Sequence, residues 1–279
     1  MPDPEPIDVR VLDTGYCLAW EHHLLRGGRR RRVECHSTVA LFRHPRAGWV
    51  LYDTGYAPRL VDCTERFPWR LYRWATPLVV RPEYAAAAQL ARLGVDARDV
   101  AHVVVSHFHA DHLAGLRDFP RARFWARRSA WTEVAGSDGL AALRRAFVPA
   151  LVPDDFERRC ELLPALEGPE LADLGPTHDL FGDGTLRLVD LPGHARGQLG
   201  LLARTGRGPL LFVADACWVR DGYRLQRPPH WITRVITDDA AERDETLARL
   251  ADYARREPSV SIVPTHCPEA FREHAEVIP

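Results

Sequence analysis

The chain has 279 residues, a hydrophobic content of 46% and a formal net charge of -1. This length fits one large α/β domain or two small ones, and the nearly neutral charge gives no general attraction to nucleic acid or to a membrane surface. Every basic residue is arginine, which excludes a Schiff-base or general-base lysine and leaves arginine as the only strong grip on an anion.

The N-terminal stretch has no basic start followed by an apolar run, and no segment approaches the roughly 18 apolar residues that a membrane helix needs. The six cysteines are scattered, without a C-x-x-C pair. We therefore expect a cytoplasmic protein with no membrane span, whose cysteines are reduced and buried rather than joined in disulfides.

In the first half of the chain, β-branched and aromatic runs between turn residues predict strands at residues 9–13, 37–44, 49–55 and 100–107. The last of them, VAHVVVSH, has the composition of a strand buried on both faces. Helices are predicted at residues 83–93, 128–135 and 139–146, the first with Pro82 near its start and Gly94 at its end.

Residues 148–180, rich in proline, glycine and acids, are predicted to form surface loops. Further strands are predicted at 185–194, 197–204, 209–218 and 259–266. A helix at 238–257 is opened by Asp238 or Asp239 and stopped before Pro258. Because strands and helices recur in both halves, the fold class is α/β.

The stretch SHFHADH, residues 106–112, carries the strongest chemical signal. On a strand, alternate side chains share a face, so His107 and His109 point the same way. Asp111 and His112 follow at the turn, where the backbone can bring them to the same place. Imidazole and carboxylate suit zinc, iron or manganese, and the number of ligands fits two ions better than one.

Three further candidate ligands are isolated in the sequence, and each follows an apolar run that is predicted to be a strand: His194, Asp215 and His266. Strand ends of this kind meet at one rim of a sheet, so these side chains are expected to converge on the histidine cluster. A cluster of imidazoles without a metal would leave several buried polar nitrogens unpaired.

The sequence resembles the metallo-β-lactamase superfamily, through LYDTG at 51–55, SHFHADH at 106–112, PGH at 192–194, AD at 214–215 and TH at 265–266, in that family's order. The resemblance implies one domain over residues 1–279 with a four-layer αββα sandwich. It implies one metal on His107, His109 and His194, a second on Asp111, His112 and His266, and Asp215 bridging both. Asp53 matches a carboxylate that stabilises the site in many members of the family. The alternative interpretation is that Asp53 is a turn residue that closes a hairpin.

Two bridged divalent ions, zinc in preference to iron or manganese, would lower the pKa of a water between them and yield a hydroxide that attacks a carbonyl or phosphoryl centre. Asp111 would carry the proton to the leaving group. The expected enzyme is therefore a metal-dependent hydrolase.

The spacing of the motifs is most similar to the acyl-homoserine-lactone lactonase branch, which implies a small-molecule lactone or ester as substrate. That branch commonly has a tyrosine three residues after the bridging aspartate, where this chain has Trp218. Tyr223 and Tyr56 are the candidates to replace its hydroxyl.

An aromatic and arginine-rich insertion at about 60–84 includes Trp69, Arg70, Arg73 and Trp74. It is interpreted either as a lid over the substrate or as a contact with a second subunit in a homodimer. If it is not a lid, selectivity would lie in residues 148–180.

Two other hydrolase activities stay open for the same site, cleavage of phosphodiesters and of thioesters in the manner of glyoxalase II. The basic stretch Arg29–Arg32 slightly favours the first as an anion-steering element, and its alternative is a solvated loop. The net charge and the lack of room for a gripping domain argue against a nucleic-acid substrate.

Overall fold

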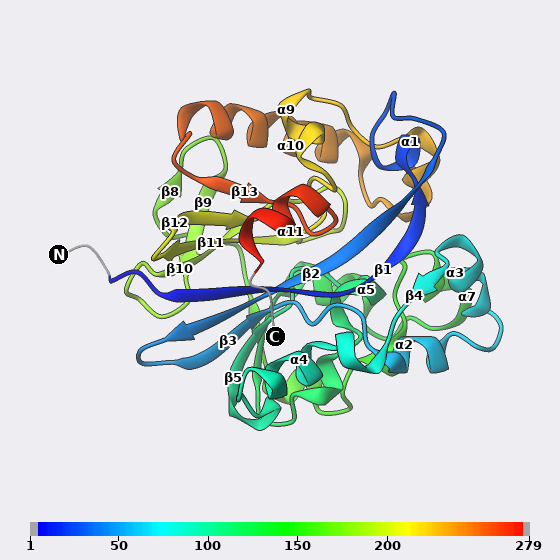
Figure 1. Ribbon diagram of the computed structural model, residues 1–279, viewed down its shortest axis with the longest axis horizontal. Helices are drawn as coiled ribbons and strands as arrows, with labels where there is room; N and C mark the ends of the chain where they lie inside the picture. Colours follow the sequence, from blue (N-terminus) through cyan, green and yellow to red (C-terminus); the bar gives the residue numbers. More distant parts are fainter. Residues whose placement is uncertain (1–4, 276–279) are drawn as a thin grey trace.

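The computed structural model describes residues 5–275, and Figure 1 shows two β-sheets stacked between two layers of helices. The first sheet has the order β4-β1-β2-β3-β5-β6-β7. The second has the order β13-β12-β11-β10-β9-β8. The strands are β1 (Asp8–Trp20), β2 (Arg32–His44), β3 (Gly48–Tyr52), β4 (Leu78–Val79), β5 (Val100–Val104), β6 (Arg123–Arg127), β7 (Cys160–Leu163), β8 (Glu170–Leu171), β9 (Gly175–Asp179), β10 (Leu186–Asp190), β11 (Leu199–Thr205), β12 (Gly208–Phe212) and β13 (Ser261–Val263).

Helices cover the outer faces of both sheets (Figure 1). The α-helices are α1 (Glu21–Leu24), α2 (Pro58–Cys63), α3 (Arg70–Ala75), α4 (Ala86–Arg92), α5 (Ala110–Leu113), α6 (Arg128–Val134), α7 (Gly139–Leu143), α8 (Phe156–Arg159), α9 (Arg220–Arg224), α10 (Ala240–Arg256) and α11 (Pro268–His274). Short 3-10 helices are η1 (Pro82–Tyr84), η2 (Ala97–Asp99), η3 (Leu116–Asp118), η4 (Pro149–Leu151) and η5 (Trp231–Ile236). Within residues 5–275, none of the helices combines the length and apolar character needed to cross a bilayer.

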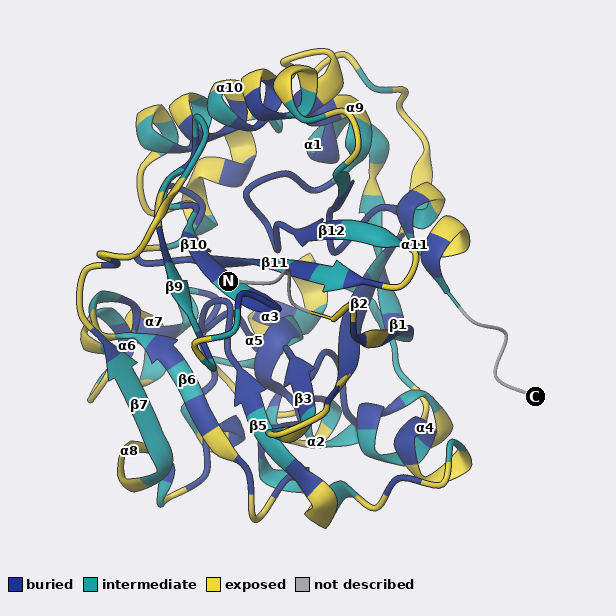
Figure 2. Cartoon of the chain, turned by 90° about the vertical axis from the view of Figure 1, so that its left-hand side faces the viewer, coloured by how far each residue is buried: buried dark blue, intermediate teal, exposed yellow. Residues whose placement is uncertain are grey.

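Alternating side chains of the strands build separate apolar layers, as the two-residue period of a strand requires. In β2, Leu41 packs with the helices α2 and α4, whereas Ala40 and Phe42 pack between the sheets. In β12, Phe212 joins the layer between the sheets and Leu211 packs beneath α10. Figure 2 shows the buried strands inside and exposed residues on the outward helix surfaces. The predicted αββα architecture is confirmed.

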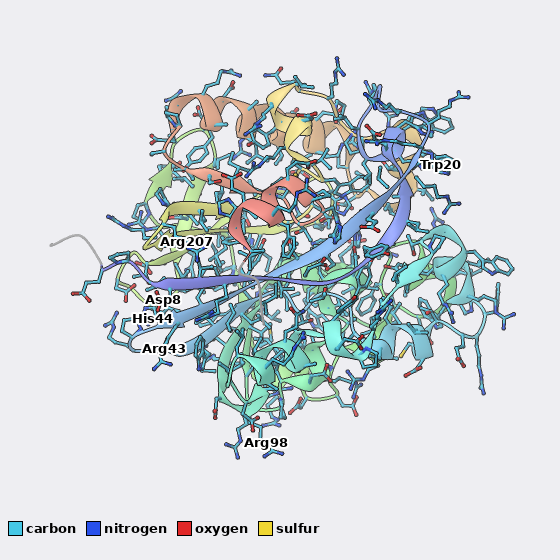
Figure 3. The ribbon with its side chains drawn as sticks, in the orientation of Figure 1. Asp8, Trp20, Arg43, His44, Arg98 and Arg207 are labelled. Atoms are coloured by element: carbon cyan, nitrogen blue, oxygen red, sulfur yellow. The ribbon has the colours of Figure 1, made fainter. Side chains whose placement is uncertain are left out.

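The strands β1 and β2 are longer than the predicted 9–13 and 37–44, and they form one antiparallel ladder from the pair Asp8 and Arg43 to the pair Trp20 and Arg32. Their far ends continue beyond the rest of the sheet, and Figure 3 shows Trp20 there, beside α1. The extension was not predicted because the basic stretch LLRGGRRRR, which lies between the two strands, has no apolar pattern. The extension matters because Cys17, Trp20 and Cys35 line a cavity of about 610 Å³.

The prediction of loops throughout residues 148–180 is wrong. This region contains α8 and the strands β7, β8 and β9, where β7 pairs with β6 and β9 pairs with β10. These are short strands at or next to the sheet edges. An edge strand pairs with only one other strand, so proline and glycine are tolerated there. Their composition therefore resembled that of loops.

The long helix near the C-terminus follows its prediction closely. Asp239 is the N-cap of α10, and its carboxylate accepts hydrogen bonds from the backbone N–H groups of Ala241 and Glu242. The helix predicted at 83–93 is divided into η1 and α4, and Gly94 follows with a positive φ of 76°. This left-handed conformation suits glycine and ends the helix.

Candidate metal centre

The SHFHADH segment leaves the first sheet earlier than predicted. The strand expected over residues 100–107 ends at Val104, and His107 and His109 lie in the loop that leads into α5. The cause is a change of hydrogen-bond partner: the Ser106 N–H donates to Asp53 Oδ1 at 2.7 Å instead of to a neighbouring strand. Asp111 and His112 then follow in the first turn of α5.

The structure brings all seven predicted ligands together in two groups. One group is His107, His109, His194 and Asp215, and the other is Asp111, His112 and His266, with the ligand atoms of each group within 4.8 Å of one another. His194 follows β10, Asp215 follows β12 and His266 follows β13. The convergence at strand ends therefore occurs at the rim where it was expected.

The carboxylate of Asp215 lies between the two groups. Its Oδ2 is 3.2 Å from His194 Nε2, while its Oδ1 is 3.1 Å from both His112 Nε2 and His266 Nε2. His266 Nε2 is also 3.2 Å from Oδ2, so the carboxylate contacts imidazoles of both groups, as a bridging carboxylate would.

Three buried polar atoms at this place have no hydrogen-bond partner: His107 Nε2, His112 Nε2 and Asp215 Oδ1. Buried polar atoms are nearly always paired, since an orphan costs about 1–3 kcal/mol. Three orphans that converge on one point from different elements fit divalent ions, for which imidazole nitrogen and carboxylate oxygen are the natural ligands.

Burial lowers the pKa of His107 and His109 well below the ordinary histidine value, and neighbouring imidazoles lower it further. Both rings are therefore neutral, which is the form that binds metal. Burial alone would also lower the pKa of His112 and His266, but Asp215 outweighs it, so that the pKa of His112 is well raised and that of His266 rises to about 9. Without an ion, a proton on these rings would neutralise Asp215, so the site needs positive charge.

Contacts behind the ligands hold them in place. Asp53 Oδ2 is 2.7 Å from His112 Nδ1 and accepts a hydrogen bond from Ser106 Oγ at 2.7 Å. Ser106 Oγ also lies 3.0 Å from His107 Nδ1, and His266 Nδ1 contacts the backbone oxygen of His36. Ser106 was not singled out from the sequence, although it opens the SHFHADH motif.

The turn that carries His194 is fixed by the start of α10. The backbone N–H groups of Asp238 and Asp239 donate to the oxygens of His194 and Gly193. Gly193 has a φ of 112°, and a Cβ there would lie 2.1 Å from the backbone nitrogen of Arg243. Only glycine fits this close approach, which explains the PGH sequence.

Residues 32–266 match the metallo-beta-lactamase superfamily. The chain belongs to this superfamily. It is 31% identical over 195 residues to the N-acyl homoserine lactonase AttM of Azorhizobium caulinodans, covering 69% of this chain and 68% of AttM. It is 28% identical to a probable metallo-hydrolase of Mycobacterium tuberculosis, over 96% of this chain and 82% of that one.

Solved structures show the same fold. An N-acyl homoserine lactone hydrolase with N-hexanoyl-L-homoserine at its catalytic metal centre matches with a TM-score of 0.74 and 16% identity, over 96% of this chain and 97% of that one. The dizinc quorum-quenching lactonase AidC matches with a TM-score of 0.66 and 14% identity, over 95% and 89%. The predicted fold and the predicted class, a metal-dependent hydrolase, are confirmed by this family membership.

A cavity of about 610 Å³ opens over the two ligand groups. His109, Asp111, Asp215 and His266 are part of its lining, and so are Trp74 and Trp218. Trp218 is 7% exposed, and its indole N–H donates to Asp215 Oδ2 at 2.8 Å.

The other predicted substrate residues lie elsewhere in the described chain. Trp69 packs against the large apolar cluster that includes α2 and α4. Arg70 and Arg73 line a separate groove of about 700 Å³, with Trp74 between the two cavities. Tyr223 packs in the apolar layer under α10, whereas Tyr56 lines the cavity over the two ligand groups.

The seven converging ligands predict two metal ions per chain after purification without chelator, measured by elemental analysis. Asp215→Ala should lose at least one ion, because the Asp215 carboxylate contacts imidazoles of both groups. Asp221→Ala is the matched control, an exposed aspartate six residues along the chain in α9. A ratio of one or below with zinc or manganese in excess contradicts a shared pair.

The contact of Asp53 with His112 predicts a second effect. Asp53→Asn should weaken the affinity for metal by about 10–100-fold, the range found when a carboxylate behind a ligating histidine is removed. Competition with a chelating dye measures this change. Asp183→Asn is the control because His44 Nε2 lies 2.9 Å from Asp183 Oδ2, and Figure 3 shows His44 at the opposite end of the ladder from Trp20. If Asp53→Asn binds metal as tightly as Asp183→Asn does, Asp53 is a turn residue without an effect on the metal centre.

Proposed function

We propose that this chain is a hydrolase that uses two divalent ions, preferably zinc, to open a lactone or another small ester. The observation that carries the proposal is the carboxylate of Asp215, which contacts imidazoles of both ligand groups and lines a cavity large enough for a small molecule. The named relatives support it, since several are N-acyl homoserine lactonases.

The ions would be held by His107, His109 and His194 on one side, by Asp111, His112 and His266 on the other, and by Asp215 between them. When bound, such a pair polarises a carbonyl oxygen and lowers the pKa of water to near neutrality. All remaining tasks fall to the protein: to seat the substrate, to exclude bulk water and to move a proton.

Asp111 is placed for the proton. Its side chain is 16% exposed, and its Oδ2 lies 3.6 Å from His266 Nε2. It is the most exposed of the candidate ligand carboxylates, and it faces the cavity where the leaving alcohol would form. One carboxylate oxygen can serve the metal group while the other takes and returns the proton.

Tyr56 is the better candidate for the hydroxyl that the lactonase branch places near the substrate. Burial, and then the nearby Cys17 and Asp111, raise the pKa of Tyr56 well above its ordinary value of 10. The phenol therefore stays protonated and can donate a hydrogen bond. Trp218, at the position expected for that tyrosine, donates to Asp215 instead.

The walls of the cavity suit an apolar acyl group. Leu18, Leu24, Leu71, Leu143 and Ile236 contribute to them. In two of the similar structures the bound molecules are N-hexanoyl-L-homoserine and N-decanoyl-L-homoserine, which shows that related cavities hold chains of different length. We propose that residues 60–84 act as a lid, because Leu71 and Trp74 of α3 lie in the wall.

The chain is further proposed to form one domain over residues 1–279 and to work in the cytoplasm, with which its six free cysteines are compatible. Two of the four arginines in the basic stretch Arg29–Arg32 already have partners. Arg31 forms an ion pair with Glu21, and the Arg32 guanidinium carbon lies 5.2 Å from the Trp20 ring centroid. This weakens the case for a phosphodiester substrate.

A panel of lactones, aryl esters, thioesters and phosphodiesters tests the reaction class. Lactones or esters should be turned over fastest by the zinc-loaded protein. If phosphodiesters or thioesters are fastest, the alternative activities described above replace the proposal.

Asp111→Asn should lower kcat on the best substrate by roughly 10²-fold or more, the scale of general acid–base contributions. The amide keeps the shape and one metal-facing oxygen but cannot carry a proton. Metal content must be measured on the same preparation. A variant with both ions and the parent rate would remove Asp111 from proton transfer.

Trp74→Ala combined with Leu71→Ala should raise KM for long-chain esters and leave that for the shortest unchanged. Each buried methylene contributes about 0.8 kcal/mol, or roughly fourfold in affinity. Phe67→Ala is the control, because Phe67 is in the same segment and, like Trp74, is 71% exposed. If the double variant keeps its chain-length preference but dissociates from a dimer, this segment is a subunit contact.

A further inference from the structure

A second cavity borders the candidate metal centre on its other side. It has a volume of about 480 Å³, and His109 and His194 belong to its lining. Its remaining walls come from α6, α7 and the segment around η5. Four of its lining residues are arginines, Arg144, Arg145, Arg196 and Arg234, against the two acids Glu133 and Asp238.

The two acids are already paired. Arg145 Nε donates to Glu133 Oε1 at 2.7 Å, and Arg196 Nε lies 3.4 Å from Asp238 Oδ2. Within residues 5–275, the guanidinium groups of Arg144 and Arg234 have no hydrogen bond or ion pair. The cavity therefore carries an excess of two positive charges, four arginines less two carboxylates.

These two free guanidinium groups come from distant parts of the chain, Arg144 directly after α7 and Arg234 within η5. Both are exposed, and both line a cavity that reaches two histidines of the metal centre. Guanidinium is the side chain best suited to carboxylate and phosphate, because its planar fork matches their oxygens.

The arginine-lined cavity and the apolar cavity share His109, Val235 and Ile236. The two cavities therefore adjoin each other beside the metal centre, and a molecule that extended across both would have its reacting bond over that centre. Its apolar part would lie against Leu71 and Trp74, and its charged part against Arg144 and Arg234.

We propose that this second cavity is an anion subsite, and that the substrate is an ester or lactone with an apolar acyl group and an oxyanion, a carboxylate or a phosphate, on its alcohol part. This inference rests on the proposed hydrolase function and makes its substrate class more specific.

The test uses three hexanoyl esters of phenols that differ only in the para substituent: a neutral carboxamide, a carboxylate and a phosphate. The zinc-loaded protein should hydrolyse at least one anionic ester with a kcat/KM about tenfold above the neutral ester. The doubly substituted Arg144→Gln, Arg234→Gln variant should lose this advantage through KM, with kcat and the neutral ester unchanged. The preference should also shrink at 1 M salt, where the screening length is about 3 Å.

Arg98→Gln is the matched control, since Arg98 is an exposed arginine of η2, and Figure 3 shows it at the far lower edge of the molecule. It should keep the full preference. Loss of preference in both variants would indicate a general charge effect and overturn the subsite.

Calorimetry with the corresponding hexanoyl amides, which resist hydrolysis, separates this proposal from the reaction itself. The anionic amide whose ester is preferred should bind the double variant about tenfold more weakly than the parent. If the neutral ester is hydrolysed but no anionic compound is favoured, the hydrolase stands and the anion subsite is wrong. If no ester is hydrolysed, the reaction class fails, and the amide titration alone supports or overturns the subsite.

Discussion

The buried carboxylate of Asp215 sets the condition that the rest of this structure meets. It is 5% exposed, lies among the imidazoles of His112, His194 and His266, and leaves Oδ1 without a hydrogen bond. Burying an ion costs several kcal/mol unless an opposite charge accompanies it. Divalent cations held by the surrounding imidazoles would supply this charge.

The two sheets make this arrangement possible because their strand ends meet at one rim. A single segment contributes three of the histidines and Asp111, while the ends of three strands of the second sheet each add one further candidate ligand. Asp53 connects the parts: it ends the ladder of β5 by accepting the Ser106 N–H, and it holds His112 Nδ1. One carboxylate thus both bends the chain toward the site and orients a ligand there.

The sequence predicted the parts of the molecule whose signals are local. The spacing of His107, His109, Asp111 and His112 is short, and His194, Asp215 and His266 each follow an apolar run, so their convergence could be inferred from strand ends alone. The αββα fold followed from the same motifs. Edge strands such as β7 and β8 were missed because they are too short to show a two-residue pattern and lie in a region rich in proline, glycine and acids.

The cavity walls could not be predicted, for a different reason. They are assembled from β1, α3, η5 and the loop after α7, and no local pattern indicates which side chains of these segments face one another. Trp69 and Trp74 look equivalent in sequence, yet one packs against the core and the other lies at the cavity. Likewise, Trp218 replaces a hydroxyl, but only the fold shows that its indole N–H is directed to Asp215.

This division separates the proposed chemistry of the metal centre from the proposed choice of substrate. A pair of ions polarises any carbonyl or phosphoryl oxygen that reaches it, so it contributes little to the choice among them. In the proposed function, the choice falls to the two cavities that adjoin at His109, one apolar and one rich in arginine. Val235 and Ile236 lie in both walls, on a short 3-10 helix that is joined to the N-terminus of α10 by three residues. The backbone N–H of Asp238, just before α10, donates to the backbone oxygen of His194. The position of this part of the cavity wall and the position of the candidate ligand His194 are therefore fixed together.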